Sequence, residues 1–171
     1  MKDDWATPQP LFDKLDDEFR FTLDVCALPE NAKCKRYFTP EQDGLKQSWS
    51  GECCWMNSPY GKEIGLWLGR AYRLALSHAI VVDGAGWDAH ITNQGVVVAL
   101  VPTRTNAPWW HDYVMKAAEI RFIRKKVSFV GDKNGVAFTG HAIVVFRPGQ
   151  HKLECSSWKQ PARVKAVRRA A

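Results

Sequence analysis

Apolar residues along the chain fall into short runs and helical repeats that alternate with one another. Residues 10–19 carry apolar positions three or four apart, which predicts an amphipathic helix, and residues 62–78 show the same period. The sequence also predicts a turn with a short helix at 28–35 and a further helix at 110–119. Short apolar runs predict strands at 21–26, 36–39, 52–56, 79–83, 96–101, 120–123, 127–130 and 142–146.

Strands that are apolar on both faces and alternate with helices indicate an α/β sheet with helices on both sides. In such sheets, ligands bind beyond the carboxyl ends of the strands. Asp24 lies at the end of one predicted strand, and Asn57 directly follows another. We therefore expect these two polar side chains on the same rim of the sheet.

The composition fits one globular domain. The chain has 171 residues, of which 46% are hydrophobic and 12% aromatic, and this is enough for a packed core. No apolar run is long enough to span a bilayer, and the stretch MKDDWATPQP lacks the apolar core of a signal peptide. We therefore expect a cytoplasmic protein with no membrane contact.

Positive charge is concentrated near the C-terminus. Residues 150–171 hold six Lys and Arg against one Glu, so they contribute +5 of the formal net charge of +6. We expect a single domain at 1–149 followed by a basic, flexible tail at 150–171, and such a tail favours a polyanionic partner. The five cysteines are an odd number without CxxC spacing, so we expect free thiols and no metal site.

The stretch NSPY at 57–60 combines groups that suit a planar amine. The side-chain oxygen of Asn57 and the backbone carbonyl of Ser58 are two hydrogen-bond acceptors, and Pro59 stiffens the chain after them. The ring of Tyr60 offers a face on which a flat group can stack. An exocyclic amine has two N–H donors, so the stretch predicts a site for an amine on a flat ring.

The stretch at 57–60 resembles the [D/N]PP[Y/F] motif of amino-methyltransferases that use S-adenosylmethionine. Segments from DWATPQPLFDKL at 4–15 to HAIVVFRP at 141–148 are similar, in order, to the phage-type DNA N-6-adenine methyltransferases, relatives of Dam. The resemblance implies a compact Rossmann-like fold with a mixed, mostly parallel sheet flanked by helices. It also implies a phage or prophage enzyme, acting in a bacterial host, that methylates a flipped-out adenine at specific sites in double-stranded DNA.

The resemblance also implies roles for individual residues. The catalytic residues are then Asn57, Ser58, Pro59 and Tyr60. The N-terminal segment then holds the methionine end of the cofactor, and the DGL step, residues 43–45, lies near its adenine. The implied cofactor residues are Trp5, Thr7, Pro8, Asp24, Cys26, Ala27, Asp43, Leu45 and Asn57. The candidate DNA contacts are Arg104, Trp109, Arg121, Arg124, Lys125 and Lys126.

The sequence departs from the family pattern at two places. Ser58 stands where the family usually has proline, which makes the backbone less rigid but keeps the carbonyl acceptor. The segment 83–95 is longer than the usual link, and we interpret it as a surface insertion or a loop over the site. His111 follows Trp109 and Trp110 at a predicted helix start, where we interpret it as a capping or packing residue, and His141 precedes a predicted strand. Neither has a partner at metal-ligand spacing, so we expect no metal.

Three other functions stay open. The same motif occurs in enzymes that methylate a glutamine amide in proteins, although the basic tail favours DNA. A DNA-binding relative that has lost activity is a second alternative, to which Ser58 points. A cytosine N4 methyltransferase is a third, but asparagine at the first motif position favours adenine.

Overall fold

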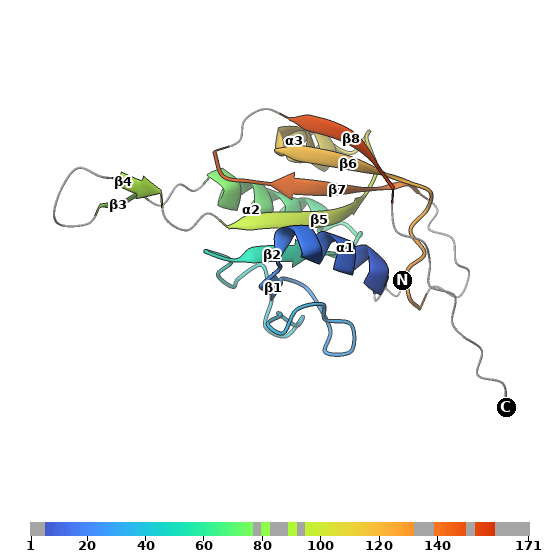
Figure 1. Cartoon of the computed structure of the whole chain (residues 1–171), viewed down its shortest axis with the longest axis horizontal. Helices are drawn as coiled ribbons and strands as arrows, with labels where there is room; N and C mark the ends of the chain where they lie inside the picture. The colour runs from blue at the N-terminus through green and yellow to red at the C-terminus, as the bar shows by residue number, and fades with distance from the viewer. Residues whose placement is uncertain are drawn as a thin grey trace.

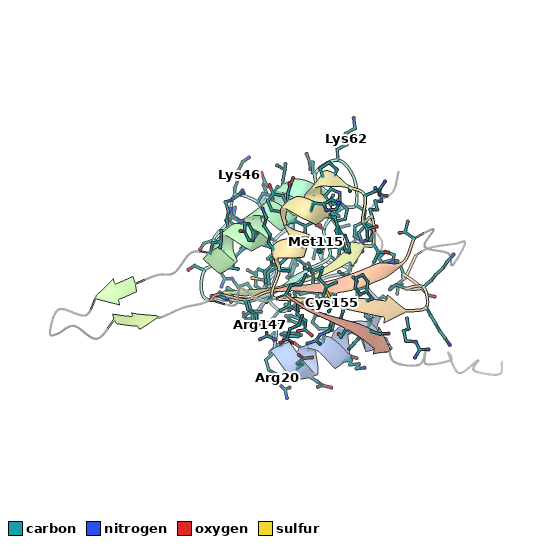
Figure 2. The ribbon with its side chains drawn as sticks, turned by 90° about the horizontal axis from the view of Figure 1, so that it is seen from above. Arg20, Lys46, Lys62, Met115, Arg147 and Cys155 are labelled. Carbon is teal, nitrogen blue, oxygen red and sulfur yellow. The ribbon has the colours of Figure 1, made fainter. Side chains whose placement is uncertain are left out.

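A computed structural model describes residues 6–76, 80–82, 89–91, 95–131, 139–149 and 153–159 of the chain. Within this part, six strands form one sheet: β1 (Leu23–Asp24), β2 (Cys53–Met56), β5 (Val96–Pro102), β6 (Glu119–Arg124), β7 (His141–Phe146) and β8 (Glu154–Lys159). The helical elements are α1 (Gln9–Phe19), α2 (Ile64–Leu76), α3 (Pro108–Asp112) and the 3-10 turn η1 (Val114–Lys116). Helix α1 lies on one face of the sheet, and α2 and α3 lie on the other (Figures 1 and 2). The predicted α/β class is therefore confirmed.

The sheet is mixed, with the strand order β1-β2-β5-β7-β6-β8. The pairs β1–β2, β2–β5 and β6–β8 are parallel, whereas β7 is antiparallel to both of its neighbours, β5 and β6. The expectation of a mostly parallel sheet was wrong, because the antiparallel strand β7 in its interior makes two of the five strand pairs antiparallel. All six positions of β7 are buried, so its sequence looks like that of a strand in a parallel sheet and carries no sign of its direction.

The topology brings five strand ends to one rim. Strands β1, β2, β5, β6 and β8 point the same way, and β7 begins where they end. Asp24 at the end of β1 and Asn57 directly after β2 therefore share this rim, as predicted. Residues after β5 and β6 and the start of β7 reach the same rim.

The core consists of two clusters, one on each face of the sheet. Helix α1 buries Leu11, Phe12 and Leu15 on the same face as Trp55. Helix α2 packs on the other face, where Cys54 and Met56 of β2 point. Both helices match the predicted periods to within two residues, apart from residues 77–78, which lie outside the described part of the chain. None of the helices that the structure describes is long and apolar enough to cross a membrane.

The run at 79–83 was wrongly expected in the main sheet. Its described residues form β3 (Ile80–Val82), which pairs antiparallel with β4 (Ala89–Ile91) in a separate two-stranded sheet. Figure 1 shows this hairpin projecting away from the main sheet. An apolar β-branched run favours a strand but does not say which strand it will pair with. Most of the long 83–95 segment lies outside the described residues.

Several weaker predictions also differ from the structure. The strand at 21–26 shrinks to two residues, and 36–39 and 127–130 each contribute one isolated bridge, Tyr37 to Asp24 and Val130 to Ala6. Residues 28–35 form turns and bends without a helix. The helix expected at 110–119 is instead the short α3 at 108–112, followed by the 3-10 turn η1 at 114–116, and β6 already begins at 119.

Strand β8 was missed because its sequence carries little strand signal. Its residues 154–157 are exposed and mostly polar, which is typical of an edge strand. It pairs with β6 over all six of its residues. Part of the basic segment at 150–171 therefore belongs to the sheet.

Candidate active site

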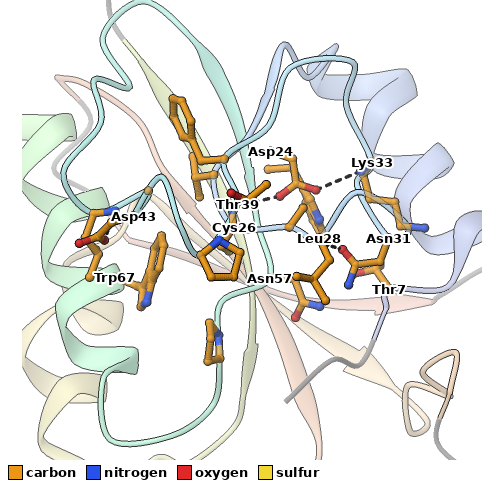
Figure 3. Close-up of a pocket in the computed structure, with 18 of the residues that line it drawn as sticks. Thr7, Asp24, Cys26, Leu28, Asn31, Lys33, Thr39, Asp43, Asn57 and Trp67 are labelled. Atoms are coloured by element: carbon orange, nitrogen blue, oxygen red, sulfur yellow. Dashed lines mark hydrogen bonds between the residues drawn. The ribbon is translucent and has the colours of Figure 1, made fainter. Parts of the chain in front are cut away.

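A cavity of about 550 Å³ opens at the rim beyond the ends of β1 and β2. Seven of the nine predicted cofactor residues line it: Thr7, Asp24, Cys26, Ala27, Asp43, Leu45 and Asn57. Pro8 immediately precedes α1 and is not part of the lining, and Trp5 lies outside the described residues. In Figure 3, Thr7, Asn31 and Lys33 lie on one side of the cavity and Asp43 and Trp67 on the other, with Asp24 and Asn57 between them.

Asp24 organises the turn that forms one wall. The residue is 2% exposed, and its carboxylate accepts hydrogen bonds from the backbone N–H groups of Cys26 (3.3 Å) and Lys33 (3.0 Å). Burial raises the pKa of Asp24 to about 6, even though both hydrogen bonds act in the opposite direction. A cationic group in the cavity would therefore favour the charged form of this carboxyl.

The DGL step forms the opposite wall. Asp43 adopts a left-handed conformation (φ 52°), and its carboxylate accepts the Leu45 N–H (3.2 Å) and pairs with Lys46 (2.9 Å). A Cβ on Gly44 would lie 2.1 Å from the carbonyl oxygen of Val25, so glycine is required for this close approach. The turn after β1 and the DGL step are thereby packed directly together.

Apolar groups make up much of the remaining lining of the cavity. Burial raises the pKa of the Cys26 thiol well above its ordinary value, so this group is neutral. Phe38, Leu66 and Trp67 add apolar and aromatic surface. In the part of the chain that the structure describes, no group of three or more His, Cys, Asp or Glu is placed to hold a metal ion.

Sequence reasoning missed several lining residues, above all Asn31 and Lys33. Asn31 Oδ1 accepts the Leu28 N–H at 2.8 Å, and Lys33 Nζ donates to Gln9 Oε1 at 2.8 Å. Both lie in the 28–35 segment, where the sequence suggested only a turn and a short helix. No local motif marks them, because they reach the cavity only through the turn that brings the Lys33 backbone N–H onto Asp24.

Asn57 links the cavity to the aromatic residue of NSPY. Its side chain lines the cavity, and its Oδ1 accepts a hydrogen bond from the Tyr60 hydroxyl at 3.0 Å. A carboxamide oxygen has two lone pairs, so this bond is compatible with a second donor. Pro59 is exposed and also lines the cavity.

The Tyr60 ring is held by two other rings. Its centroid lies 5.6 Å from that of His141 and 6.2 Å from that of Phe129, and those two rings are 5.2 Å apart. His141 is 2% exposed, and burial lowers its pKa to about 4, so it packs as a neutral ring. The sequence indicated only that His141 precedes a strand, and in the structure it begins β7 and packs against Tyr60 and Phe129. His111 is exposed on α3.

Ser58 is buried rather than directed into the cavity. It is 3% exposed, and its hydroxyl has no hydrogen-bond partner among the described residues. An unpartnered buried hydroxyl costs about 1–3 kcal/mol. Proline, the usual residue of the motif at this position, has no such group, so the serine is a destabilising substitution in this respect.

Four of the five predicted cationic DNA contacts are exposed near the rim. Arg104 follows β5, and Arg124, Lys125 and Lys126 lie at the end of β6. Trp109 is half-buried in α3. Strands β5 and β6 lie on either side of β7 and point the same way as β2, so the cations at their ends lie on the rim that carries Asn57.

Arg121 must be removed from the candidate DNA contacts. It is 8% exposed, and its guanidinium pairs with Glu18 of α1 and with Glu119, both at 2.6 Å. Alternate residues of a strand point to opposite faces, so Arg121 faces α1 while Arg124 does not. Arg121 is therefore a structural residue that ties α1 to β6.

Comparison with known proteins adds independent information. A family model described as DNA N-6-adenine-methyltransferase (Dam) matches residues 1–166. The chain is 31% identical over 137 residues to the DNA N-6-adenine-methyltransferase of Haemophilus phage HP1, covering 78% of this chain and 70% of that protein. It is 25% identical over 142 residues to the protein of the same name from Escherichia phage T1, covering 82% of this chain and 52% of that relative. The chain thus spans about half the length of the T1 protein.

Proposed function

The chain belongs to the DNA N-6-adenine-methyltransferase (Dam) family, and from this premise we propose that it transfers a methyl group from S-adenosylmethionine to N6 of an adenine flipped out of double-stranded DNA. The observation that carries the proposal is the position of Asn57. Its side chain lines the 550 Å³ cavity and follows a strand whose end lies on the same rim as exposed cations. One residue can thereby face both a cofactor in the cavity and a base that arrives from DNA.

The character of the cavity supports S-adenosylmethionine as the methyl donor. Its volume lies within the usual range for small-molecule sites. The Asp24 carboxyl suits a cationic ligand, and the neutral, apolar surface of Cys26 and Trp67 suits a flat, uncharged ring. When bound, the cofactor supplies the electrophilic methyl group.

We assign the two acceptors of NSPY to the target adenine. Asn57 Oδ1 and the Ser58 carbonyl hold the two N6 hydrogens, so that the nitrogen lone pair is aimed at the methyl carbon. The bond between the methyl carbon and the sulfonium sulfur would break as the new N–C bond forms, with S-adenosylhomocysteine as the leaving group, and these fixed dipoles would stabilise the positive charge that develops on N6. The N6 proton then leaves to water. Flipping the base out of the duplex costs a few kcal/mol.

We assign DNA binding to the exposed cations of the rim. In this proposal Arg104, Arg124, Lys125 and Lys126 contact phosphates near the flipped base, and their exposure at the rim supports this role. Phosphate contacts of this kind supply affinity and register rather than sequence information. Arg121 has no part in this surface because it is bound to two carboxylates.

The experiment that tests this function follows a labelled methyl group. The purified protein is incubated with methyl-labelled S-adenosylmethionine, unmethylated bacterial DNA and an added protein extract, and the macromolecules are then separated. We expect the label in DNA. Label in the protein fraction would instead indicate a glutamine-amide methyltransferase, and absence of both label and cofactor binding would indicate an inactive DNA-binding relative.

A further inference from the structure

One end of the cavity is rich in hydrogen-bond donors. Lys33 Nζ donates one of its three N–H groups to Gln9 Oε1 at 2.8 Å, which leaves two for another acceptor. Asn31 accepts from Leu28 through Oδ1, so its amide nitrogen with two further N–H groups is turned away from that bond. Both residues line the cavity on the side where Thr7 lies, and the Lys33 side chain reaches past Asn31 toward Gln9 of α1 (Figure 3).

The donors at this end are held rigidly in place. The backbone N–H of Lys33 binds the buried Asp24 carboxylate at 3.0 Å, and the ammonium is anchored to Gln9 at the start of α1. Lys33 is half-buried, and burial lowers its pKa, whereas Asp13 and Asp24 favour its charged form. A partly desolvated ammonium attracts an anion more strongly than one in bulk water.

The order of groups across the cavity is asymmetric. The hydrogen-bond donors Asn31 and Lys33 lie at one end of the cavity, and the Asp24 carboxyl lies in the middle (Figure 3). The aromatic ring of Trp67 and the Asp43 carboxylate lie at the far end. A ligand that matches this order carries a carboxylate at its head, a cation next to it and a flat ring at its tail. S-adenosylmethionine has these groups in this order.

We propose that Lys33 and Asn31 form the subsite for the amino-acid carboxylate of the cofactor, with Lys33 as its charged partner. This inference rests on the proposed function and adds to it the two residues that fix which way round the cofactor lies. It assigns a binding role to a segment that sequence motifs left without one.

A ligand-truncation cycle tests the proposal without measuring activity. The full chain and its Lys33→Met variant are titrated calorimetrically with S-adenosylhomocysteine, which has the amino-acid head, and with 5′-methylthioadenosine, which lacks it. Methionine keeps the apolar stem of lysine, and the Lys33 backbone bond to Asp24 does not depend on the side chain. We expect Lys33→Met to weaken S-adenosylhomocysteine binding about tenfold or more and methylthioadenosine binding less than about twofold.

Controls separate the possible failures. Asn31→Ala removes the second donor and should also weaken only the ligand with the amino-acid head, while Lys35→Ala changes an exposed lysine outside the lining and should change neither affinity. Equal losses for both ligands, or no loss for either, would overturn the carboxylate subsite. If the unchanged protein binds neither ligand, the proposed function itself fails.

Discussion

Asn57 is the residue on which the two halves of the site meet. Its oxygen is held by the Tyr60 hydroxyl at 3.0 Å, and the Tyr60 ring is in turn fixed by His141 and Phe129. The orientation of the amide is therefore set by aromatic packing behind it. Dipoles that are fixed before the reaction stabilise developing charge more effectively than ones that must first reorient.

Ser58 allows the carbonyl and the hydroxyl to be tested separately. In our account only the carbonyl acts, so Ser58→Ala should keep methyl transfer within about threefold of the unchanged protein. The unfolding free energy should stay the same or rise by about 1 kcal/mol, because an unpartnered buried hydroxyl is removed. Turnover and urea denaturation measure the two effects. A large loss of turnover in a folded variant would mean that the hydroxyl takes part.

Asp24 gives the protein a pH dependence with a definite sign. Its pKa is about 6 in the folded protein against an ordinary value of 3.8, so folding favours the protonated form. The stability that this group contributes is therefore fully present below pH 3.8 and is lost as the pH rises through about 6. Near neutral pH the group is a buried carboxylate that benefits from a cationic ligand.

Binding of a cation to the site should therefore strengthen as the pH rises. We expect the affinity for S-adenosylmethionine, whose sulfonium is positive, to increase between pH 5 and pH 7 across the Asp24 pKa of about 6. S-adenosylhomocysteine lacks this charge, so its affinity should change less. Calorimetry of both ligands at the two pH values measures the difference, and equal pH dependence would contradict a cation beside Asp24.

Strand β6 uses its two faces for different purposes. Arg121 points to α1 and pairs with Glu18 and Glu119, whereas Arg124 is exposed at the strand end. Charged hydrogen bonds of this kind each stabilise a protein by about 1.5–3 kcal/mol, less where a partner is solvent-exposed, as Glu18 partly is. The same residue type thus has a structural role at one position and an exposed position near the rim at the other.

Two substitutions on this strand should have opposite effects. Arg121→Leu should lower the unfolding free energy by about 2 kcal/mol and leave the DNA affinity of the folded protein unchanged. Arg124→Ala should change stability by less than about 0.5 kcal/mol and weaken DNA binding. Chemical denaturation and fluorescence anisotropy with a labelled duplex measure both. A large loss of DNA affinity in folded Arg121→Leu would return Arg121 to the DNA-binding surface.

Some elements could be predicted from local sequence and others could not. Helices α1 and α2 follow from their own amphipathic periods, which need no knowledge of distant partners. The direction of β7, the separate pairing of β3 with β4 and the edge strand β8 depend on which strands meet in space. The apolar runs of β3 and β7 indicate strands but not their pairing partner or direction. The polar, exposed residues of β8 do not indicate a strand at all.

The same distinction applies to the site. Asp24 and Asn57 could be placed on one rim because strand ends in an α/β sheet gather there. Lys33 and Asn31 could not, because they reach the cavity only through the turn that folds back onto Asp24. Arg121 was misassigned because a sequence of basic residues does not reveal which of them face a carboxylate.

At the scale of the whole molecule, positive charge and the site share one rim. Arg104 follows β5 and Arg124 ends β6, and both strands point to the rim where β2 ends. Arg73 lies near the C-terminal end of α2, where the neighbouring Leu74 approaches Gly95 just before β5. Each phosphate neutralised at the rim should release counterions, so that log K falls by about 0.9 per tenfold rise in salt.

Salt titrations should therefore distinguish the two ends of the molecule. Arg104→Ala should make the slope of log K against log salt shallower by about 0.9. Arg73→Ala removes an exposed arginine from the opposite end and should leave the slope unchanged. Anisotropy titrations of a labelled duplex at several salt concentrations give both slopes. Equal changes for the two variants would mean that DNA contacts are not confined to the rim.

Identifying the methylated nucleoside tests directly whether the protein methylates adenine at N6 through Asn57. Unmethylated DNA is incubated with S-adenosylmethionine and either the unchanged protein or Asn57→Ala, then digested and analysed by mass spectrometry. We predict N6-methyladenine with the unchanged protein, and a loss of about 100-fold or more with Asn57→Ala, which should still bind S-adenosylhomocysteine. N4-methylcytosine, or N6-methyladenine formed equally well by both proteins, would contradict the account.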